Sequence, residues 1–249
     1  MSFERALVTG ASAGIGRAIA VELAGRGTDL VAVARRQELL EELADEVPVD
    51  VEVLPADLAS EEGLSRVEER LRGGDAPIDL LVNNAGASDM GRFAKLDVDR
   101  AELQIELNCV AAVRLTHAAL PGMRARRRGA VLFTSSTASF QPLPALAVYG
   151  ATKAFLTSFG QALHEELKST GVTSTVLCPG FTDTDFVGDA IPEQILMDVE
   201  PVARAAVDAA EKGRAQVTTG IGNKVHAAAA AVLPGGALGK LAGKALGIG

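Results

Sequence analysis

The chain has 249 residues, of which 48% are hydrophobic and 22% are charged, and its formal net charge is −8. This composition excludes an extended disordered chain and argues against a surface that neutralises a nucleic-acid backbone. No run reaches the roughly 18 apolar residues of a membrane span, and no apolar leader opens the chain, so we expect a cytoplasmic protein. Cys109 and Cys178 are expected to be buried, reduced thiols, and no metal site is expected.

Short apolar runs alternate with helical stretches along the chain. Strands are expected at residues 6–8, 30–33, 51–54, 78–82, 130–133, 172–177 and 216–219. Helices are expected at residues 14–25, 38–46, 61–72, 101–127, 149–169 and 201–212. Strands that are apolar on both faces and alternate with helices predict an α/β fold, with a parallel sheet covered by helices on each side. Neither a linker nor a repeat interrupts the pattern, so residues 1–249 are expected to form one domain.

The first strand runs into a glycine-rich turn, TGASAGIG at residues 9–16, just before a helix. Glycines allow the backbone to approach a pyrophosphate, and the helix N-terminus favours its negative charge. Tight turning alone can also explain such glycines. Between a strand and a helix, however, the turn favours dinucleotide binding.

Two arginines, Arg35 and Arg36, follow the second strand, where an acidic residue commonly binds a free ribose 2′-hydroxyl. Guanidinium groups suit a 2′-phosphate instead, through charge-assisted bonds. Solvated arginines at the start of a helix are the alternative. With the glycine turn upstream, the pair favours NADP over NAD.

Polar residues also end the third and fourth strands. Asp57, before Leu58, can accept from an adenine amino group or cap the next helix. Asn83 and Asn84 stand at the edge where open α/β sheets bind ligands, although they can also satisfy stray backbone groups. Asn108 is a poor helix former within an expected helix, which suggests a local kink or a water site.

The stretch from Ser135 to Lys153 indicates a proton-transfer site. Tyr149 is the only tyrosine of the chain, and Lys153 follows it by four residues, so both can share one helix face. A nearby ammonium, with a positive oxidised nicotinamide, is expected to lower the tyrosine pKa from its ordinary value near 10. Tyr149 would then exchange a proton with a substrate oxygen that Ser136 holds in place.

In this order, the motifs resemble the short-chain dehydrogenase/reductase family from about residue 3 to residue 185. The resemblance implies a doubly wound, Rossmann-type sheet of seven parallel strands and an Asn108–Ser136–Tyr149–Lys153 catalytic tetrad, in which Asn108 holds a water beside Lys153. It implies cofactor contacts from a larger set of positions, namely Gly10, Ser12, Gly14, Ile15, Gly16, Arg35, Arg36, Asp57, Leu58, Asn84, Ala85, Gly86, Tyr149, Lys153, Pro179, Gly180, Thr182 and Thr184. The chain departs from many NADP-using members at Ala13, where they carry a basic residue, which leaves Arg35, Arg36 and Arg17 to set the preference.

The resemblance also implies a small-molecule carbonyl or alcohol substrate and a homodimer or homotetramer, formed through helices near residues 101–127 and 149–169. Residues 185–198 are expected to be a substrate lid, with residues 87–92 and 141–144 as further, mostly apolar walls. In the C-terminal extension, residues 221–249, an alanine-rich stretch at residues 226–233 and a second short stretch at residues 238–246 are expected to be helical. The extension can lie on a membrane surface, cover a partner, cap the pocket or pack on its own domain. Alternative functions are a 3-oxoacyl thioester reductase, with the arginines of residues 124–128 as a docking patch, and a non-catalytic NADP-binding regulator.

Overall fold

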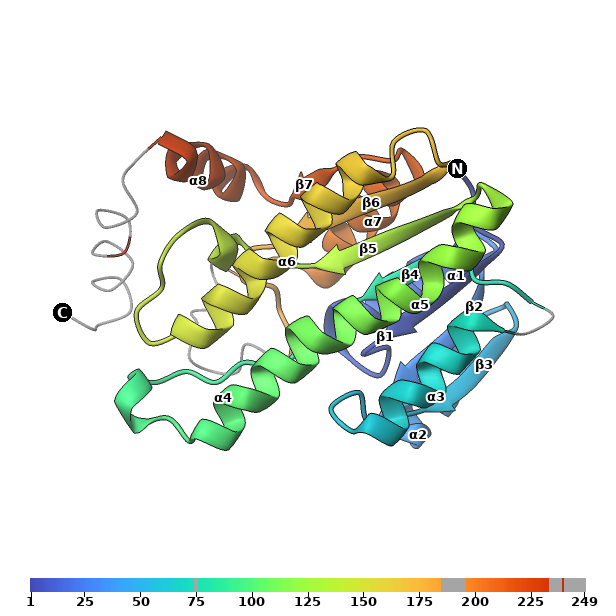
Figure 1. Ribbon diagram of the computed structural model, residues 1–249, viewed down its shortest axis with the longest axis horizontal. Coiled ribbons are helices and arrows are strands. Elements are labelled where there is room, and N and C mark those ends of the chain that lie inside the picture. Colours follow the sequence, from blue (N-terminus) through green and yellow to red (C-terminus); the bar gives the residue numbers. More distant parts are fainter. Residues whose placement is uncertain (74–75, 185–195, 233–238, 240–249) are drawn as a thin grey trace.

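The computed structural model describes residues 1–73, 76–184, 196–232 and 239 (Figure 1). Its centre is a sheet of seven parallel strands in the order β3-β2-β1-β4-β5-β6-β7. The strands are β1 Arg5–Thr9, β2 Asp29–Ala34, β3 Val51–Pro55, β4 Leu80–Asn83, β5 Gly129–Thr134, β6 Val172–Cys178 and β7 Gln216–Thr218. The sequence prediction of a doubly wound, seven-stranded parallel sheet is therefore confirmed.

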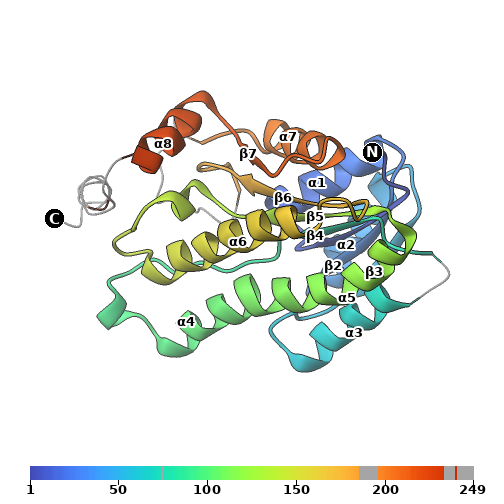
Figure 2. The same ribbon diagram turned by 45° about the horizontal axis from the view of Figure 1, so that its top comes forward.

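Helices cover both faces of this sheet, as the two ribbon views show (Figures 1 and 2). The described helices are α1 Gly14–Gly25, α2 Gln37–Glu46, α3 Glu61–Arg72, α4 Val98–Ile105, α5 Ala111–Arg126, α6 Ala147–Glu166, α7 Val199–Glu211 and α8 Ile221–Val232. Helices α1, α2 and α7 pack on one face, and helices α3, α5 and α6 pack on the other. This arrangement is the result of right-handed crossovers between parallel strands.

Alternating side chains of each central strand enter different cores. In β1, Ala6 and Val8 join the core under α1 and α7, whereas Leu7 joins the core under α5 and α6. In β5, Leu132 and Phe133 divide between the two cores in the same way. Because successive strand residues point to opposite faces, a strand buried on both sides must be apolar throughout. The continuous apolar runs of the sequence follow from this requirement.

The helical segment between β4 and β5 contains a π-helical turn. The sequence predicts a single helix at residues 101–127, but the segment begins at Val98, and a π-helical turn at Glu106–Val110 separates α4 from α5. Asn108 lies in the middle of this turn. Such turns insert one extra residue into a helix and are frequent at functional sites. Of the two explanations considered for Asn108, the local distortion is present.

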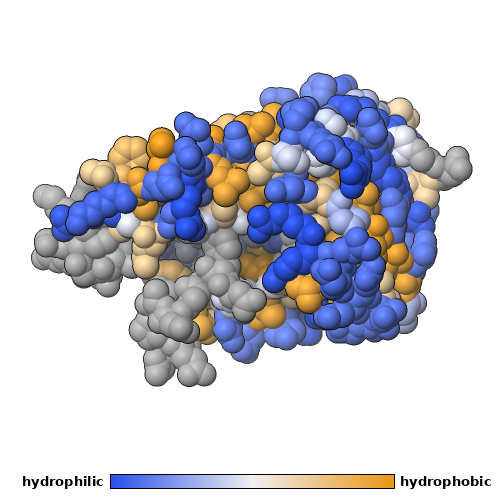
Figure 3. Space-filling view, turned by 90° about the horizontal axis from the view of Figure 1, so that it is seen from below, coloured by the Kyte–Doolittle hydropathy of each residue, from blue (hydrophilic) through white to orange (hydrophobic). Residues whose placement is uncertain are grey.

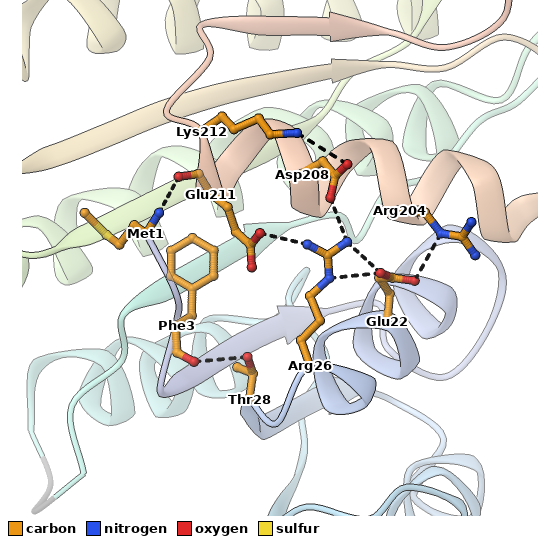
Figure 4. Close-up of polar contacts among 9 residues, drawn as sticks. All are labelled: Met1, Phe3, Glu22, Arg26, Thr28, Arg204, Asp208, Glu211 and Lys212. Atoms are coloured by element: carbon orange, nitrogen blue, oxygen red, sulfur yellow. Dashed lines mark hydrogen bonds and ion pairs between the residues drawn. The ribbon is translucent and has the colours of Figure 1, made fainter.

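A network of ion pairs joins α1 to α7 (Figure 4). The guanidinium of Arg26, which follows α1, contacts Glu22 at 2.6 Å, Asp208 at 2.8 Å and Glu211 at 2.8 Å. The amino terminus of Met1 also donates to the backbone oxygen of Glu211, at 2.6 Å. Because α1 begins at the glycine turn, the network fixes the helix whose N-terminus faces the expected pyrophosphate.

Part of the C-terminal extension belongs to the fold. The alanine-rich stretch expected to be helical at residues 226–233 is helix α8, which starts earlier, at Ile221, and packs against β7 and the short helix η3, Thr137–Phe140. The second helix expected at residues 238–246 lies outside the described residues, except for Gly239. Most of the expected lid, residues 185–195, also lies outside them.

Candidate active site

The predicted site residues gather at one edge of the sheet, where β1, β4, β5 and β6 end. The glycine turn follows β1, Asn84 follows β4, Ser136 follows β5 and Gly180 follows β6. Strand order reverses between β1 and β4, so the adjacent crossovers leave on opposite faces. In open α/β sheets, the crevice at such a switch point is where ligands bind.

The glycine turn has the backbone that a phosphate site requires. Gly10 and Gly14 have φ values of 68° and 55°, a region that L-residues with side chains seldom adopt. Gly16 has no room for a Cβ, because Asn84 and the backbone of Gly10 fill that position. Ala13, the N-cap of α1, makes no side-chain capping bond, and the first turn holds no acidic residue. The first N–H groups of α1 therefore fit a pyrophosphate.

Thr9 ties the glycine turn to the end of β4. Its hydroxyl donates to Val82 O at 3.0 Å and accepts from the N–H groups of Asn84 at 2.9 Å and Ala85 at 3.0 Å. The Asn84 amide donates to Thr9 O at 3.0 Å. The Asn84 side chain thus satisfies a backbone carbonyl, as the more modest interpretation of the paired asparagines proposed. The Asn83 amide nitrogen instead donates to a side chain, the Thr116 hydroxyl, at 3.0 Å.

Arg35 and Arg36 are exposed beside the glycine turn. The Arg36 guanidinium donates to the Ser12 hydroxyl at 3.2 Å, which brings the end of β2 against the turn. Arg17 pairs with Glu46 on α2, so the suggestion that it helps to bind a 2′-phosphate is not supported. The arrangement leaves Arg35 and Arg36 as the cations that fit this phosphate.

Asp57 and Leu58 lie at the neighbouring end of β3. Asp57 is exposed and accepts from the N–H of Ala59 at 3.1 Å, whereas the N-cap of α3 is Ser60, which accepts from Gly63 N. The alternative role of Asp57 as a helix cap is therefore wrong. Leu58 is buried with 6% exposure, so only its backbone can meet a ligand.

The Ser136 side chain lies near the Tyr149 hydroxyl. Burial raises the pKa of Tyr149 to about 12, and the nearby Ser136 hydroxyl lowers it only in part. This direction is opposite to the lowering expected from the sequence. That expectation includes the positive charge of an oxidised nicotinamide. The groups of the protein alone do not lower the pKa of Tyr149 below its ordinary value. In the protein alone, the tyrosine is held as a neutral phenol, ready to donate a proton.

Lys153 is buried on the same helix face, with 4% exposure. Its ammonium donates to Thr134 O at 2.8 Å and lies 5.6 Å from the centre of the Tyr149 ring. Burial lowers the pKa of Lys153 to about 8, while the nearby thiols of Cys109 and Cys178 act in the opposite direction. The ammonium therefore stands beneath the tyrosine ring and can approach ribose hydroxyls above Gly86.

Asn108 connects three segments at the base of the site. Its amide oxygen accepts from Ala87 N at 2.8 Å, and its amide nitrogen donates to Ala87 O and the Thr152 hydroxyl, both at 2.9 Å. Both N–H groups are therefore used, and only the oxygen keeps a free lone pair for a water. The π-helical turn is what directs this side chain toward α6 rather than along the α-helical face.

The turn after β6 lies opposite the glycine turn. Pro179 O accepts from Thr137 N at 2.9 Å, which ties the turn to the residue after Ser136. The Thr182 hydroxyl donates to Gly180 O at 3.1 Å, and the Thr184 hydroxyl donates to Thr182 O at 3.3 Å. A methyl carbon of Thr184 lies 3.1 Å from where a Cβ of Gly14 would stand. The two turns therefore bracket the space between them.

The expected pocket walls are partly described. The N–H of Gly91 donates to Ala145 O at 2.8 Å, which joins the expected wall of residues 87–92 to the loop that follows residues 141–144. Hydrophobic residues show in a recess near the middle of the face seen from below, while the right-hand half of that face is mostly hydrophilic (Figure 3). Of the expected lid, Phe186, Val187, Ile191 and Ile195 lie outside the described residues.

Sequence reasoning missed the residues that hold the site together. Ser135 donates to Lys153 O at 2.8 Å and is 2.7 Å from the Thr157 hydroxyl, which seats α6 on β5. Thr152 donates to Tyr149 O at 2.8 Å and also receives the bond from Asn108. Their position beside each predicted catalytic residue was a signal, but neighbouring hydroxyls are too common to be singled out.

A doubly wound sheet with a glycine turn, an arginine pair and a Ser–Tyr–Lys set at the ends of its strands defines a nucleotide-dependent oxidoreductase of the Rossmann type. The short chain dehydrogenase family model matches residues 4–194, and the chain belongs to this family. The family resemblance proposed from the sequence motifs is confirmed.

The relatives cover most of the chain. It is 35% identical over 230 residues to an uncharacterized oxidoreductase of Myxococcus xanthus, covering 88% of each chain. It is 36% identical over 189 residues to the very-long-chain 3-oxoacyl-CoA reductase of Bos taurus, covering 73% of this chain but only 60% of that protein.

Solved structures agree with these relatives. A short-chain dehydrogenase from Sphingobium yanoikuyae in complex with NADPH is 34% identical, with a TM-score of 0.82 and coverage of 98% of this chain and 94% of that one. A bulky-bulky ketone specific alcohol dehydrogenase from Comamonas testosteroni is 32% identical, with a TM-score of 0.79 and coverage of 89% and 88%.

Proposed function

We propose that this chain is an NADP-dependent oxidoreductase that reduces the carbonyl of a hydrophobic substrate, or oxidises the corresponding alcohol, with Tyr149 as the general acid or base. The observation that carries the proposal is the set of Tyr149, Ser136 and the buried Lys153 at the switch point of the sheet. A glycine turn with uncapped N–H groups and the pair Arg35 and Arg36 support NADP as the cofactor. The NADPH complex of the Sphingobium yanoikuyae relative also supports it.

The reaction follows from the positions of these side chains. Bound NADPH supplies the hydride. Ser136 holds the substrate oxygen against Tyr149, and the neutral Tyr149 hydroxyl donates a proton to that oxygen as the alcohol forms. The Lys153 ammonium stabilises the phenolate that remains, since it stands 5.6 Å from the ring centre. Asn108, with one free lone pair on its amide oxygen, holds a water for proton resupply.

Removing only the tyrosine hydroxyl tests this assignment. Tyr149→Phe is expected to keep the NADPH dissociation constant and to lose most turnover, about 100-fold or more, because general acid catalysis by a positioned group contributes about that much. Turnover is measured as NADPH oxidation across a panel of ketones, aldehydes, sugars and acyl thioesters, repeated with NADH. Phe159→Leu, a change at a partly buried ring of the same helix, is the matched control. Turnover like that of the wild type in Tyr149→Phe would contradict the assignment.

A 3-oxoacyl thioester is the second candidate substrate class, favoured by the likeness to the very-long-chain 3-oxoacyl-CoA reductase. The arginines of residues 124–128 do not strengthen it. Arg126 donates to Ile78 O at 3.0 Å, Arg127 donates to Ser169 O at 3.0 Å, and Arg128 pairs with Asp79 at 3.3 Å. They also precede β5, whereas Ser136 follows it, about 20 Å farther along the strand. Acyl-CoA turnover in the panel decides between the two classes.

The third candidate, a non-catalytic NADP-binding regulator, is the least supported. The chain retains both Tyr149 and Lys153, and Ser135 fixes the backbone of Lys153 in the position that catalysis needs. Tight NADPH binding without turnover of any member of the panel would favour the regulator.

A homodimer or homotetramer is part of the proposal. Three apolar side chains are exposed on the predicted interface. They are Val110 at the end of the π-helical turn, Val113 on α5 and Phe155 on α6, with relative exposures of 44%, 36% and 42%. Apolar side chains on adjoining helices are typical of subunit contacts. Sedimentation of the wild type as a monomer at micromolar concentration would refute this part.

The buried thiols of Cys109 and Cys178 support the proposal of a reducing, cytoplasmic location. In the part of the chain that the structure describes, no helix is long and apolar enough to cross a membrane.

A further inference from the structure

Asn223 of helix α8 contacts the turn after β6. Its amide nitrogen donates to Thr219 O at 2.9 Å and contacts the Met197 sulfur at 3.4 Å. A Cβ at position 180 would stand only 2.8 Å from the amide carbon of Asn223 and 2.9 Å from its amide oxygen. The Asn223 amide therefore occupies the space that any side chain larger than glycine would need at position 180.

Met197 carries this contact to the segment that follows the same turn. Its N–H donates to Phe181 O and its carbonyl accepts from Asp183 N, both at 2.9 Å, and it forms a parallel bridge with Thr182. The Met197 sulfur also accepts from the Thr219 hydroxyl at 3.8 Å. Residues 181–183 are thus bonded to Met197, a residue of the expected lid, and the Met197 sulfur accepts from the residue after β7 and from α8.

The turn that Asn223 supports belongs to the active site. Pro179 is bonded to the residue after Ser136, and Thr184 touches the position of Gly14 in the glycine turn. Helix α8 also packs directly against η3, the turn that Ser136 caps. We propose that Asn223 is a positioning residue that holds Gly180 and Met197 in the conformation required to bind the cofactor, so that α8 determines NADPH affinity. This inference rests on the proposed function.

A double-mutant cycle tests the proposal. The variants are Asn223→Ala, Gly180→Ala and their combination, with Lys224→Ala, an exposed neighbour on α8, as the matched control. The measurements are the NADPH dissociation constant, by titration of NADPH fluorescence, and the unfolding midpoint in urea. Each single substitution is expected to raise the dissociation constant about tenfold, because the interaction free energies of contacting residues correspond to changes of that order. Lys224→Ala should leave it unchanged.

The combined variant distinguishes positioning from a general loss of stability. When the Asn223 amide is removed, the methyl group that Gly180→Ala adds has room, so the double variant should bind NADPH no more weakly than either single variant. The proposal is overturned if Asn223→Ala lowers the unfolding midpoint but keeps the wild-type NADPH affinity, or if the two single effects multiply. If the wild type itself does not bind NADPH, the proposed function fails and this inference fails with it. In that case, coupled unfolding midpoints would assign Asn223 a purely structural role.

Discussion

The buried ammonium of Lys153 makes the wild type less stable than a variant without it. A pKa of about 8 instead of 10.5 means that keeping this group charged inside the protein costs about 3 kcal/mol at about pH 7. Lys153→Met removes the charge and keeps most of the volume, but it leaves Thr134 O without its 2.8 Å bond, which offsets about 1–2 kcal/mol. We therefore expect the variant to be inactive and yet about 1–2 kcal/mol more stable at neutral pH.

The difference in stability between Lys153→Met and the wild type is expected to depend on pH. The folded pKa is below the unfolded pKa, so between pH 8 and 10.5 the unfolded chain binds more protons, and wild-type stability rises with pH through this lysine. At about pH 9.5 the cost of the wild-type lysine has fallen to about 1 kcal/mol, a reduction of about 2 kcal/mol. The advantage of Lys153→Met over the wild type should therefore shrink by about this amount.

Urea unfolding of both proteins at about pH 7 and about pH 9.5 measures the effect. Cys178 and Tyr149 have raised pKa values that act in the opposite sense at high pH. Both are present in wild type and variant, so the difference between the two proteins reports the lysine together with its interaction with the nearby thiols. Lys224→Met, at an exposed position, is the control and should show no such pH dependence. A stability difference between Lys153→Met and wild type that does not change with pH would refute the reasoning.

Three further predictions concern the cofactor turn and its support. Gly16→Ala should abolish NADPH binding, measured by fluorescence titration, because Asn84 and Gly10 leave no space for its methyl group; Gly25→Ala, where no atom lies within 4 Å, should instead stabilise the protein by about 0.5 kcal/mol. Arg36→Ala should weaken NADPH binding about tenfold or more and leave NADH binding unchanged, since only the former carries a 2′-phosphate; an equal loss for both cofactors would contradict this role. Arg26→Ala should lower the free energy of unfolding by about 1–3 kcal/mol, less at high salt, as chemical denaturation at two salt concentrations would show.

The sheet was predictable because strands that are buried on both faces must be apolar throughout, and such apolar runs are easily recognised in the sequence. The boundary of α6 is off by two residues, since the helix starts at Ala147 rather than at Tyr149. No apolar pattern marks that start, and Leu146 makes no side-chain capping bond there. The π-helical turn could be anticipated only as an anomaly at Asn108, because the bonds that accompany it join Asn108 to Ala87 and Thr152, which lie far away in the sequence.

The catalytic side chains were predictable as a set, but their electrostatics were not. Burial of Tyr149 and Lys153 depends on how α6 sits on β5, which residues far apart in the sequence determine. Desolvation consequently exceeds the attraction between the two groups that their four-residue spacing suggests. The support from Asn223 could not be anticipated either, because it comes from a helix that begins more than forty residues after Gly180, as the numbering shows.

The extra residue in the π-helical turn at Glu106–Val110 limits which changes of sequence the helical segment tolerates. One residue advances an α-helix by about 100°. The turn therefore sets the buried side of α5 out of phase with that of α4, and each half can follow its own neighbours. A deletion within the turn would restore a regular helix while rotating Asn108 and everything before it away from Thr152. A substitution in this turn changes the contacts of one side chain. A deletion or insertion changes the orientation of every residue on one side of the turn.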